Sequence, residues 1–327
     1  MSNNFNPLLS YSKRLQSILV KASRQKSPAL FLYRTDARTL IFMLEALTRL
    51  FDKSFEEKIF KKWNKRFKKL EDVLGQIDYF VAFEKEFSFN KKISKKIIRP
   101  LNSEVKTLTK KFNSYLLNKK WLVDRLLSFD KKMLEYPLYY DHKFATQIKK
   151  NLEGEINKIL SFCEKAGFSF TNLEDDVHEL RRALRWISIY ATALNGLIQL
   201  KKSTKKPKYN INYLTKDILN SPFNKLAAKP KGCSILEFDS NSFYALSFLI
   251  KELGRLKDKG LRTHALSQAI VTSEKLSPLQ AKTKALKILG LEKNSETEIL
   301  KAASDLMYTA LIKDRVLQGL IVDQKSA

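Results

Sequence analysis

The sequence is poor in the residues that break helices, form disulfides and bind metals. Glycine and proline contribute only 9 and 8 of the 327 residues. This scarcity disfavours an all-β fold, which needs many turns, and favours long helices with short connections. Only two cysteines, Cys163 and Cys233, and three histidines are present, and they do not stand at the spacing of a zinc site. We therefore expect free thiols in a reducing compartment and no metal.

Long apolar runs and enzyme motifs are missing from the sequence as well. No stretch approaches about 18 uncharged apolar residues, so we expect no transmembrane segment, and the N-terminus lacks the pattern of a signal peptide. There is no Walker-type phosphate loop and no HExxH helix. Salt bridges to neighbouring lysines explain Asp78 and Asp258 better than a metal does. Without a nucleophile, a base or a metal set, we predict a non-catalytic, cytoplasmic protein that has no cofactor.

Positive charge is what the sequence has in abundance. Lysine and arginine number 61 against 34 acidic residues, which gives a formal net charge of +27. Such a charge attracts polyanions, and the candidates are nucleic acid, an anionic membrane surface and polyphosphate. Lysines outnumber arginines by 47 to 14, and lysine contacts phosphate as a point charge, without the fork that reads base edges. The composition therefore favours recognition that does not depend on sequence.

Residues 172–200 form the most informative stretch of the chain, and their pattern predicts a single amphipathic helix. Apolar residues recur at alternating spacings of three and four, which keeps one stripe against a neighbouring helix. A basic stripe begins beside this packing seam, and it consists of His178, Arg181, Arg182 and Arg185. We predict that His178 donates to a phosphate, more strongly when protonated. The alternative is that His178 packs in the first helical turn against Glu174 or Asp175.

Most of the remaining chain also has helical periodicity. We predict a helix over residues 29–51, another over 55–86 and a basic one over 90–99 that stops at Pro100. Further helices are expected over residues 240–257, 261–274, 278–289 and 296–317. Residues 201–239 contain three prolines and many lysines, and we interpret them as a long lysine-rich loop with a short helix.

The two halves of the sequence share a weak internal repeat. The segment that begins at Tyr33, YRTDARTLIFMLEAL, aligns with VHELRRALRWISIYA, which begins at Val177. The alignment pairs Arg34 with His178, Arg38 with Arg182, Phe42 with Trp186 and Gly75 with Gly254. A repeat of this kind predicts two similar helical halves, 1–137 and 138–327, related by a pseudo-two-fold axis. A chance match between two amphipathic helices that carry arginines remains the alternative.

These motifs resemble those of the CHAD family, the conserved-histidine α-helical domain. Val177-His178 with Leu180-Arg181 and Leu184-Arg185 is similar to the opening helix of that family, and Leu253-Gly254 with Asp258 is similar to its helix corner. Leu74-Gly75 with Asp78 follows the same order in the first half. That half departs from the family pattern at Arg34, where a histidine is usual, and at Ile41.

The resemblance implies an all-α fold in which two pseudo-symmetric four-helix bundles form one compact domain with a central basic channel. It also implies binding of inorganic polyphosphate and association with polyphosphate granules. Sequence-independent nucleic-acid binding is the alternative function, with Tyr209 and Tyr213 as the aromatics that could stack on bases. The candidate polyphosphate-binding residues are His178, Arg181, Arg182, Arg185, Arg34, Arg38, Lys68, Lys110, Lys111 and Lys257.

Overall fold

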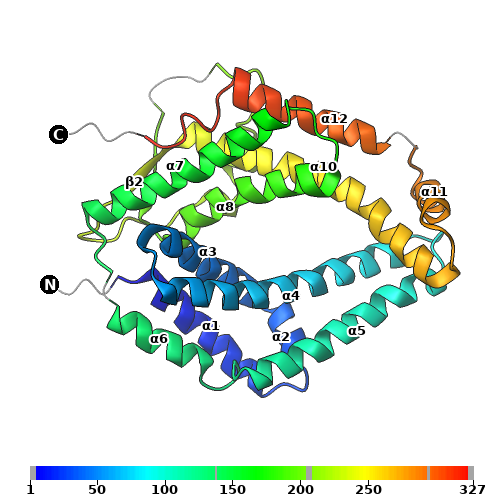
Figure 1. The fold of residues 1–327 in the computed structure, drawn as a ribbon, viewed down its shortest axis with the longest axis horizontal. Coiled ribbons are helices and arrows are strands. Elements are labelled where there is room, and N and C mark those ends of the chain that lie inside the picture. The colour runs from blue at the N-terminus through cyan, green and yellow to red at the C-terminus, as the bar shows by residue number, and fades with distance from the viewer. Residues whose placement is uncertain (1–4, 137, 204–207, 293–294, 323–327) are drawn as a thin grey trace.

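The computed structural model describes residues 5–136, 138–203, 208–292 and 295–322, and helices dominate it (Figure 1). The all-α fold class predicted from the sequence is confirmed. The helices of the first half are α1 (Pro7–Ser23), α2 (Pro28–Arg34), α3 (Ala37–Phe55), α4 (Lys58–Ser88), α5 (Lys95–Asn118) and α6 (Arg125–Glu135). Those of the second half are α7 (His142–Lys165), the π-helical turn η1 (Leu173–His178), α8 (Glu179–Ala193), α9 (Lys216–Leu219), the 3-10 turn η2 (Pro222–Asn224), α10 (Ser240–Glu274), α11 (Pro278–Leu289), α12 (Ser295–Tyr308) and the π-helical turn η3 (Thr309–Lys313).

The two halves of the chain form two layers that meet in one hydrophobic core. Figure 1 shows α1 to α6 on one side and α7, α8, α10 and α12 on the other. Helices α3 and α8 pack against each other at the centre, where the rings of Phe42 and Trp186 meet edge to face with centroids 6.2 Å apart. Buried residues from Leu8 to Leu320 join the same core. The predicted boundary between the halves falls on residue 137, which lies outside the described residues.

A second, smaller core joins the layers at the other end of the molecule. It combines Phe83 and Phe87 of α4 with the first turns of α5, the last turns of α10 and helix α11. The prediction that Pro100 ends a helix was wrong, because α5 runs through it. Ile97, Ile98 and Leu101 are buried in this core. Their packing outweighs the backbone hydrogen bond that a proline removes.

Four predicted helices have different boundaries in the structure. The helix predicted over residues 29–51 is divided at Thr35 and Asp36 into α2 and α3. The stretch 172–200 begins with the π-helical turn η1 and leaves the helix after Ala193, because Asn195 and Gly196 adopt positive φ angles of 48° and 99°. The helices predicted over 240–257 and 261–274 are one continuous helix, α10.

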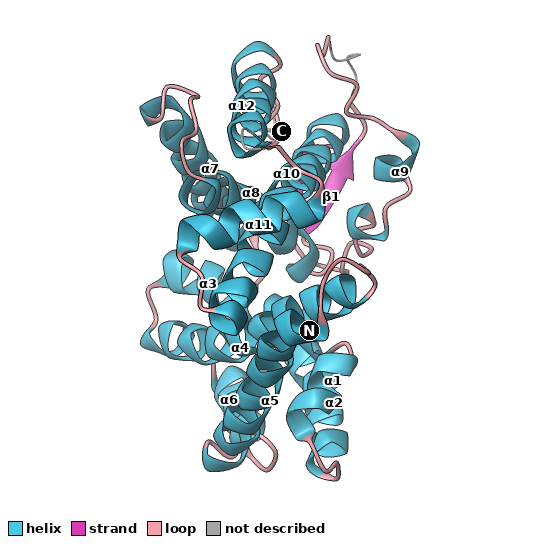
Figure 2. Ribbon diagram, turned by 90° about the vertical axis from the view of Figure 1, so that its right-hand side faces the viewer, coloured by secondary structure: helices cyan, strands magenta, loops and turns pink. Residues whose placement is uncertain are grey.

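Two short strands stand at the two ends of the lysine-rich segment 201–239. Strand β1 (Ile198–Lys201) pairs in parallel with β2 (Leu236–Asp239), which brings the two ends of the segment together. Figure 2 shows β1 beside α10. The short helix predicted in this segment corresponds to α9, and lysines 205 and 206 lie outside the described residues. In the part of the chain that the structure describes, no helix has the length and apolarity to span a bilayer.

Candidate functional site

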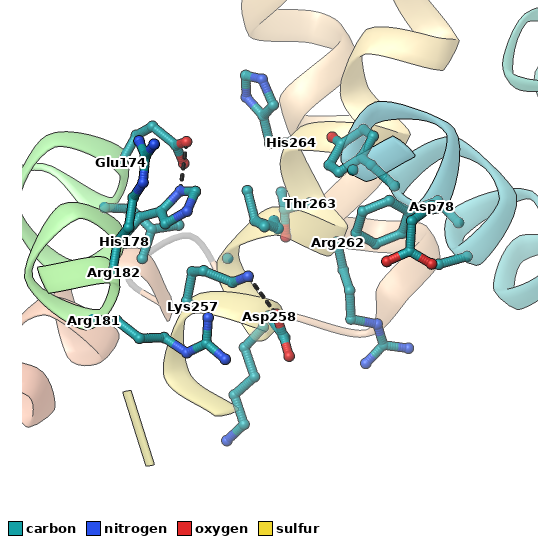
Figure 3. A pocket seen from close by; sticks show the side chains of 18 of the residues that line it. Asp78, Glu174, His178, Arg181, Arg182, Lys257, Asp258, Arg262, Thr263 and His264 are labelled. Carbon is teal, nitrogen blue, oxygen red and sulfur yellow. Dashed lines mark hydrogen bonds and ion pairs between the residues drawn. The ribbon is translucent and has the colours of Figure 1, made fainter. Parts of the chain in front are cut away.

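A cavity of about 1490 Å³ lies between the two halves of the chain. Helices α3 and α4 line it from the first half, and η1, α8 and α10 line it from the second, with contributions from α11 and α12. The cavity extends from Phe42 and Trp186 at the main core to Phe83 at the second core. Figure 3 shows side chains from both halves, with Asp78 of α4 on the same side of the view as Arg262 of α10, and Glu174 and His178 on the other. The volume exceeds the about 300–1,000 Å³ usual for small-molecule pockets, so an extended ligand can be accommodated.

The structure brings seven of the ten predicted site residues together at this cavity. Its lining includes Arg38, Lys68, His178, Arg181, Arg182, Arg185 and Lys257. Arg34 does not line it, because the break after α2 places this residue at the exposed end of a separate short helix. Lys110 and Lys111 are exposed on α5, and Figure 1 shows α4 between α5 and the second half. The shared cavity predicted for His178 and Arg34 is therefore formed with Arg38 instead.

Three arginines from two helices form the electrostatic centre of the cavity. Arg38 projects from α3, while Arg181 and Arg185 lie one turn apart on α8. Burial lowers the pKa of Arg185, and the neighbouring charges of Arg181 and Arg38 lower it further. Burial also lowers the pKa of Arg181. Among the described residues, neither Arg181 nor Arg185 forms a salt bridge, although Asp258 and Glu71 partly offset their charges.

The ring of Phe42 and two carboxylates hold part of this arginine cluster in place. The Arg185 guanidinium lies over the ring at 4.8 Å from its centroid, and that of Arg38 lies at 5.6 Å. Arg38 also forms salt bridges to Glu71 at 3.0 Å and to Asp78 at 2.6 Å. The cluster is therefore anchored on the α3–α4 side, while Arg181 and Arg185 on the α8 side have no salt bridge to a described carboxylate.

Two glycines allow the arginines to reach the neighbouring helices. A Cβ atom on Gly75 would lie 2.9 Å from Nη2 of Arg38, and one on Gly254 would lie 2.8 Å from Nε of Arg181. The Nε group of Arg181 donates to the carbonyl oxygen of Ile250 at 3.1 Å, one turn before Gly254. In each half, therefore, an arginine side chain packs against a glycine of a neighbouring helix. This geometry pairs Arg38 with Arg181, one residue away from the pairing with Arg182 that the sequence alignment gave.

His178 ends the π-helical turn η1 and contacts a carboxylate of the same turn. Its Nδ1 lies 2.6 Å from Oε1 of Glu174, the contact that Figure 3 draws as a dashed line. Asn172 caps the turn by accepting from the backbone amides of Glu174 and Asp175. The packing alternative for His178 is thus realised in the structure. Its half-buried ring nevertheless lines the cavity.

Most other cations of the cavity are paired with acids. Lys68 contacts Asp72 at 2.7 Å, Arg182 contacts Glu179 at 3.3 Å, Lys257 contacts Asp258 at 3.0 Å, Lys282 contacts Glu296 at 2.6 Å and Arg262 contacts Glu86. The lining contains nine lysines and arginines against seven acidic residues. The predicted basic channel is therefore only slightly positive before the histidines are counted. Among the described lining cations, Arg181, Arg185 and Lys259 form no salt bridge; Lys259 is exposed, whereas the two arginines are half-buried.

Several residues that line the cavity were not predicted from the sequence. Lys259, Arg262 and His264 lie on α10 at the point where two separate helices were predicted, so recognition of one continuous helix would have placed them on the cavity wall. Tyr79 on α4 lines the cavity too, and burial, with a contribution from Glu174 of the opposite half, raises its pKa to about 12. That electrostatic influence crosses the cavity, so no pattern along the chain could reveal it.

The stacking role considered for two tyrosines of the lysine-rich segment is not supported by the structure. Tyr213 is completely buried, and its hydroxyl donates to Asp314 at 2.7 Å. The ring of Tyr209 is half-buried against Tyr213, with centroids 5.0 Å apart. These rings therefore belong to the packing of the segment against the main core, and they do not present a platform to bases.

Metal ligands and known relatives do not add to this description. Among the residues placed in the structure, no group of three or more His, Cys, Asp or Glu side chains is arranged to hold a metal ion.

Comparison of the chain with protein-family models, with curated proteins and with solved structures gives no match. Function is therefore inferred from the cavity and its charges.

Proposed function

We propose that this protein is a non-catalytic binder of phosphate polyanions and that inorganic polyphosphate occupies the cavity between its halves. One observation carries the proposal. Arg181 and Arg185 are half-buried beside Arg38, and neither has a salt bridge to a described carboxylate. Buried charges are normally paired, because removal from water costs several kcal/mol per ion. An anionic ligand would supply the missing partner.

Phosphate suits this site because of the geometry of the guanidinium group. Arginine donates in a planar fork that matches two phosphate oxygens, and such charge-assisted bonds are about twice as strong as neutral ones. The Arg38 guanidinium lies over Phe42 beside that of Arg185. The adjacent forks could therefore contact successive phosphates of one chain without a large rearrangement.

The paired cations would extend the site along the cavity. Lys68 on α4 and Lys257 on α10 lie on opposite halves, each held by an exposed or half-exposed carboxylate. Exposed ion pairs contribute only about 0–1 kcal/mol, so phosphates can replace the carboxylates at small cost. A linear chain of phosphates would gain such contacts along its length, whereas a single phosphate would gain only those at the arginine cluster.

The resemblance to the CHAD family agrees with this location. His178, Arg181 and Arg185 carry that resemblance, and all three line the cavity. We accordingly propose that the chain is a CHAD-like protein, in which the site is asymmetric because Arg34 lies outside it. A polyphosphate ligand would place the protein in the cytoplasm at polyphosphate granules.

Substitution of the two unpaired arginines tests the proposal. We expect Arg181→Gln with Arg185→Gln to weaken polyphosphate binding at least tenfold at moderate salt, because each arginine loses charge-assisted hydrogen bonds. Titration of labelled polyphosphate, followed by fluorescence anisotropy, measures this loss. The matched control is Lys143→Gln with Lys165→Gln, which removes two charges from exposed positions on α7. Equal affinities for the two double variants would exclude the cavity as the binding site.

A further inference from the structure

A second cationic surface lies outside the cavity, on the outer side of α4, α5 and α6. We call it the outer basic face, and it consists of Lys62, Lys65, Arg66 and Lys69 of α4, Lys111 of α5 and Arg125 of α6. The four α4 residues follow spacings of three and four, which place them on one side of the helix. Members of this face are absent from the cavity lining.

Contacts between the three helices hold these cations side by side. The Lys69 ammonium lies 5.7 Å from the centroid of the Tyr115 ring on α5, and Lys111 lies one helical turn before that tyrosine. The Arg66 guanidinium lies 4.4 Å from the Trp63 ring centroid. Trp63 packs in turn against Phe129 of α6, with centroids 4.9 Å apart. The outer basic face is therefore carried by three helices that pack against one another.

The outer basic face contains cations with no described acid to neutralise them. Residues 58–70 and 105–123 include no aspartate or glutamate, and no member of the face forms a salt bridge to a described residue. Burial lowers the pKa of Arg66, and the nearby charge of Arg125 lowers it further. The Nε group of Arg125 is buried without a hydrogen-bond partner in the described part of the chain. In the cavity, by contrast, most cations have a carboxylate beside them.

The dimensions of the face match the backbone of a nucleic-acid duplex. Lys62 and Lys69 are seven residues apart on α4, which corresponds to about 10 Å of helix. A duplex carries one negative charge per about 1.7 Å of its axis, so about six phosphates lie within that distance. The described part of α4 from Lys58 to Leu70 exposes no large apolar side chain. On the other elements of the face, Leu117, Val123 and Leu127 are exposed, so binding to anionic vesicles is measured alongside binding to a duplex.

We propose that the outer basic face binds the phosphate backbone of double-stranded nucleic acid, independently of base sequence and separately from the cavity. Arg66, beside Arg125, would contact the backbone with its guanidinium fork, while the lysines would act as point charges. Lysine-rich contacts on a helix surface position a duplex without reading its bases. The interaction should weaken steeply with salt, because each phosphate contact releases counterions.

A triple substitution tests this surface in the full-length chain. We expect Lys62→Gln, Arg66→Gln and Lys69→Gln together to weaken binding of a labelled DNA duplex of about 20 base pairs at least tenfold. The slope of log affinity against log salt should fall by between two and three, since each lost contact contributes about 0.9. The matched control, Lys143→Gln with Lys150→Gln and Lys165→Gln, removes three exposed charges from α7. It should retain affinity within about threefold.

Four further experiments separate this proposal from its rivals. An RNA duplex of the same length shows whether A-form or B-form geometry is preferred. If the triple variant unfolds, Lys65→Gln with Lys111→Gln replaces it, because both of these lysines are exposed. Equal loss in the triple variant and its α7 control would mean that only net charge matters, and would overturn the proposal. So would binding to phosphatidylserine vesicles in place of duplexes. Loss of duplex binding in the Arg181→Gln, Arg185→Gln variant would instead assign the duplex to the cavity.

Discussion

Among single residues, Arg185 and Glu45 show the sharpest conflict between burial and charge. The Arg185 guanidinium lies over the ring of Phe42, whereas Glu45 on α3 has only 3% of its surface exposed. Its Oε2 atom has no hydrogen-bond partner among the described residues. Burial, and then the nearby charge of Glu71, raise the pKa of Glu45 to about 7. Glu71 in turn pairs with Arg38, so the protonation of Glu45 is linked to the edge of the site.

The raised pKa of Glu45 predicts a pH-dependent stability. The unfolded chain keeps a glutamate pKa near 4.5, so the native state binds more protons between about pH 4.5 and 7. Stability is therefore lost as pH rises through this window and stays lower above it. We expect Glu45→Gln to raise the free energy of unfolding by about 2–3 kcal/mol at pH 8 and to change it little at pH 4. Urea unfolding at both pH values measures the difference, and equal effects at the two would contradict the assignment.

At the scale of elements, the shape of the cavity depends on close contacts between helices more than on the helices themselves. Helix α10 passes Arg181 at Gly254, and it passes Leu173 of η1 at Gly260, where a Cβ atom would lie 2.1 Å from Cδ2 of that leucine. These two glycines sit within a 35-residue helix that a propensity argument would divide. They bring α10 close to η1 and α8, which form the wall opposite α4. The shape of the cavity therefore depends on the absence of a side chain at Gly254 and Gly260.

Replacement of Gly254 by alanine tests this dependence. The new Cβ would lie within 2.8 Å of Nε of Arg181, so Arg181 must move and lose its hydrogen bond to Ile250. We expect polyphosphate affinity to fall at least threefold, although alanine improves intrinsic helix stability by about 1 kcal/mol. Gly154→Ala on α7 is the matched control, because its Cβ would meet nothing within 4 Å. It should leave binding unchanged, and a similar loss in both variants would contradict the role of Gly254.

Element boundaries show where the sequence was informative and where it was not. Caps such as Asn172 and Ser277 are the kind of boundary that a sequence records, because a cap depends on amides two or three residues away. The break between α2 and α3 and the continuity of α5 through Pro100 depend on packing between distant segments. The paired strands β1 and β2 join residues 35 or more positions apart. Local propensity does not record such contacts.

The candidate site was also predictable only in part, because local patterns record the direction of a side chain and not its distant partners. Arg38, Arg181 and Arg185 stand next to apolar positions of strongly periodic helices, so their direction follows from the pattern along the helix. Lys110 and Lys111 were assigned on charge alone, and charge does not specify which side of a helix faces a cavity. The carboxylates that neutralise Lys68 and Lys257 were also present in the sequence. Their pairing could be established only from the structure.

At the scale of the whole molecule, the net charge of +27 is distributed unevenly. The cavity between the halves is almost neutral except at the arginine cluster, whereas the outer basic face has no described acid. A polyanion would therefore meet two different sites on one molecule. If both proposals hold, the cavity would bind a phosphate chain between the layers, and the outer basic face would bind a duplex.

Competition between the two ligands tests the central claim most directly. Labelled polyphosphate is bound to the protein at about 150 mM salt, where surface charges are largely screened beyond about 8 Å, and is challenged with a DNA duplex at equal phosphate concentration. We predict that most of the polyphosphate stays bound, because the duplex cannot reach Arg181 and Arg185. Complete displacement of polyphosphate by the duplex would contradict a polyphosphate site in the cavity.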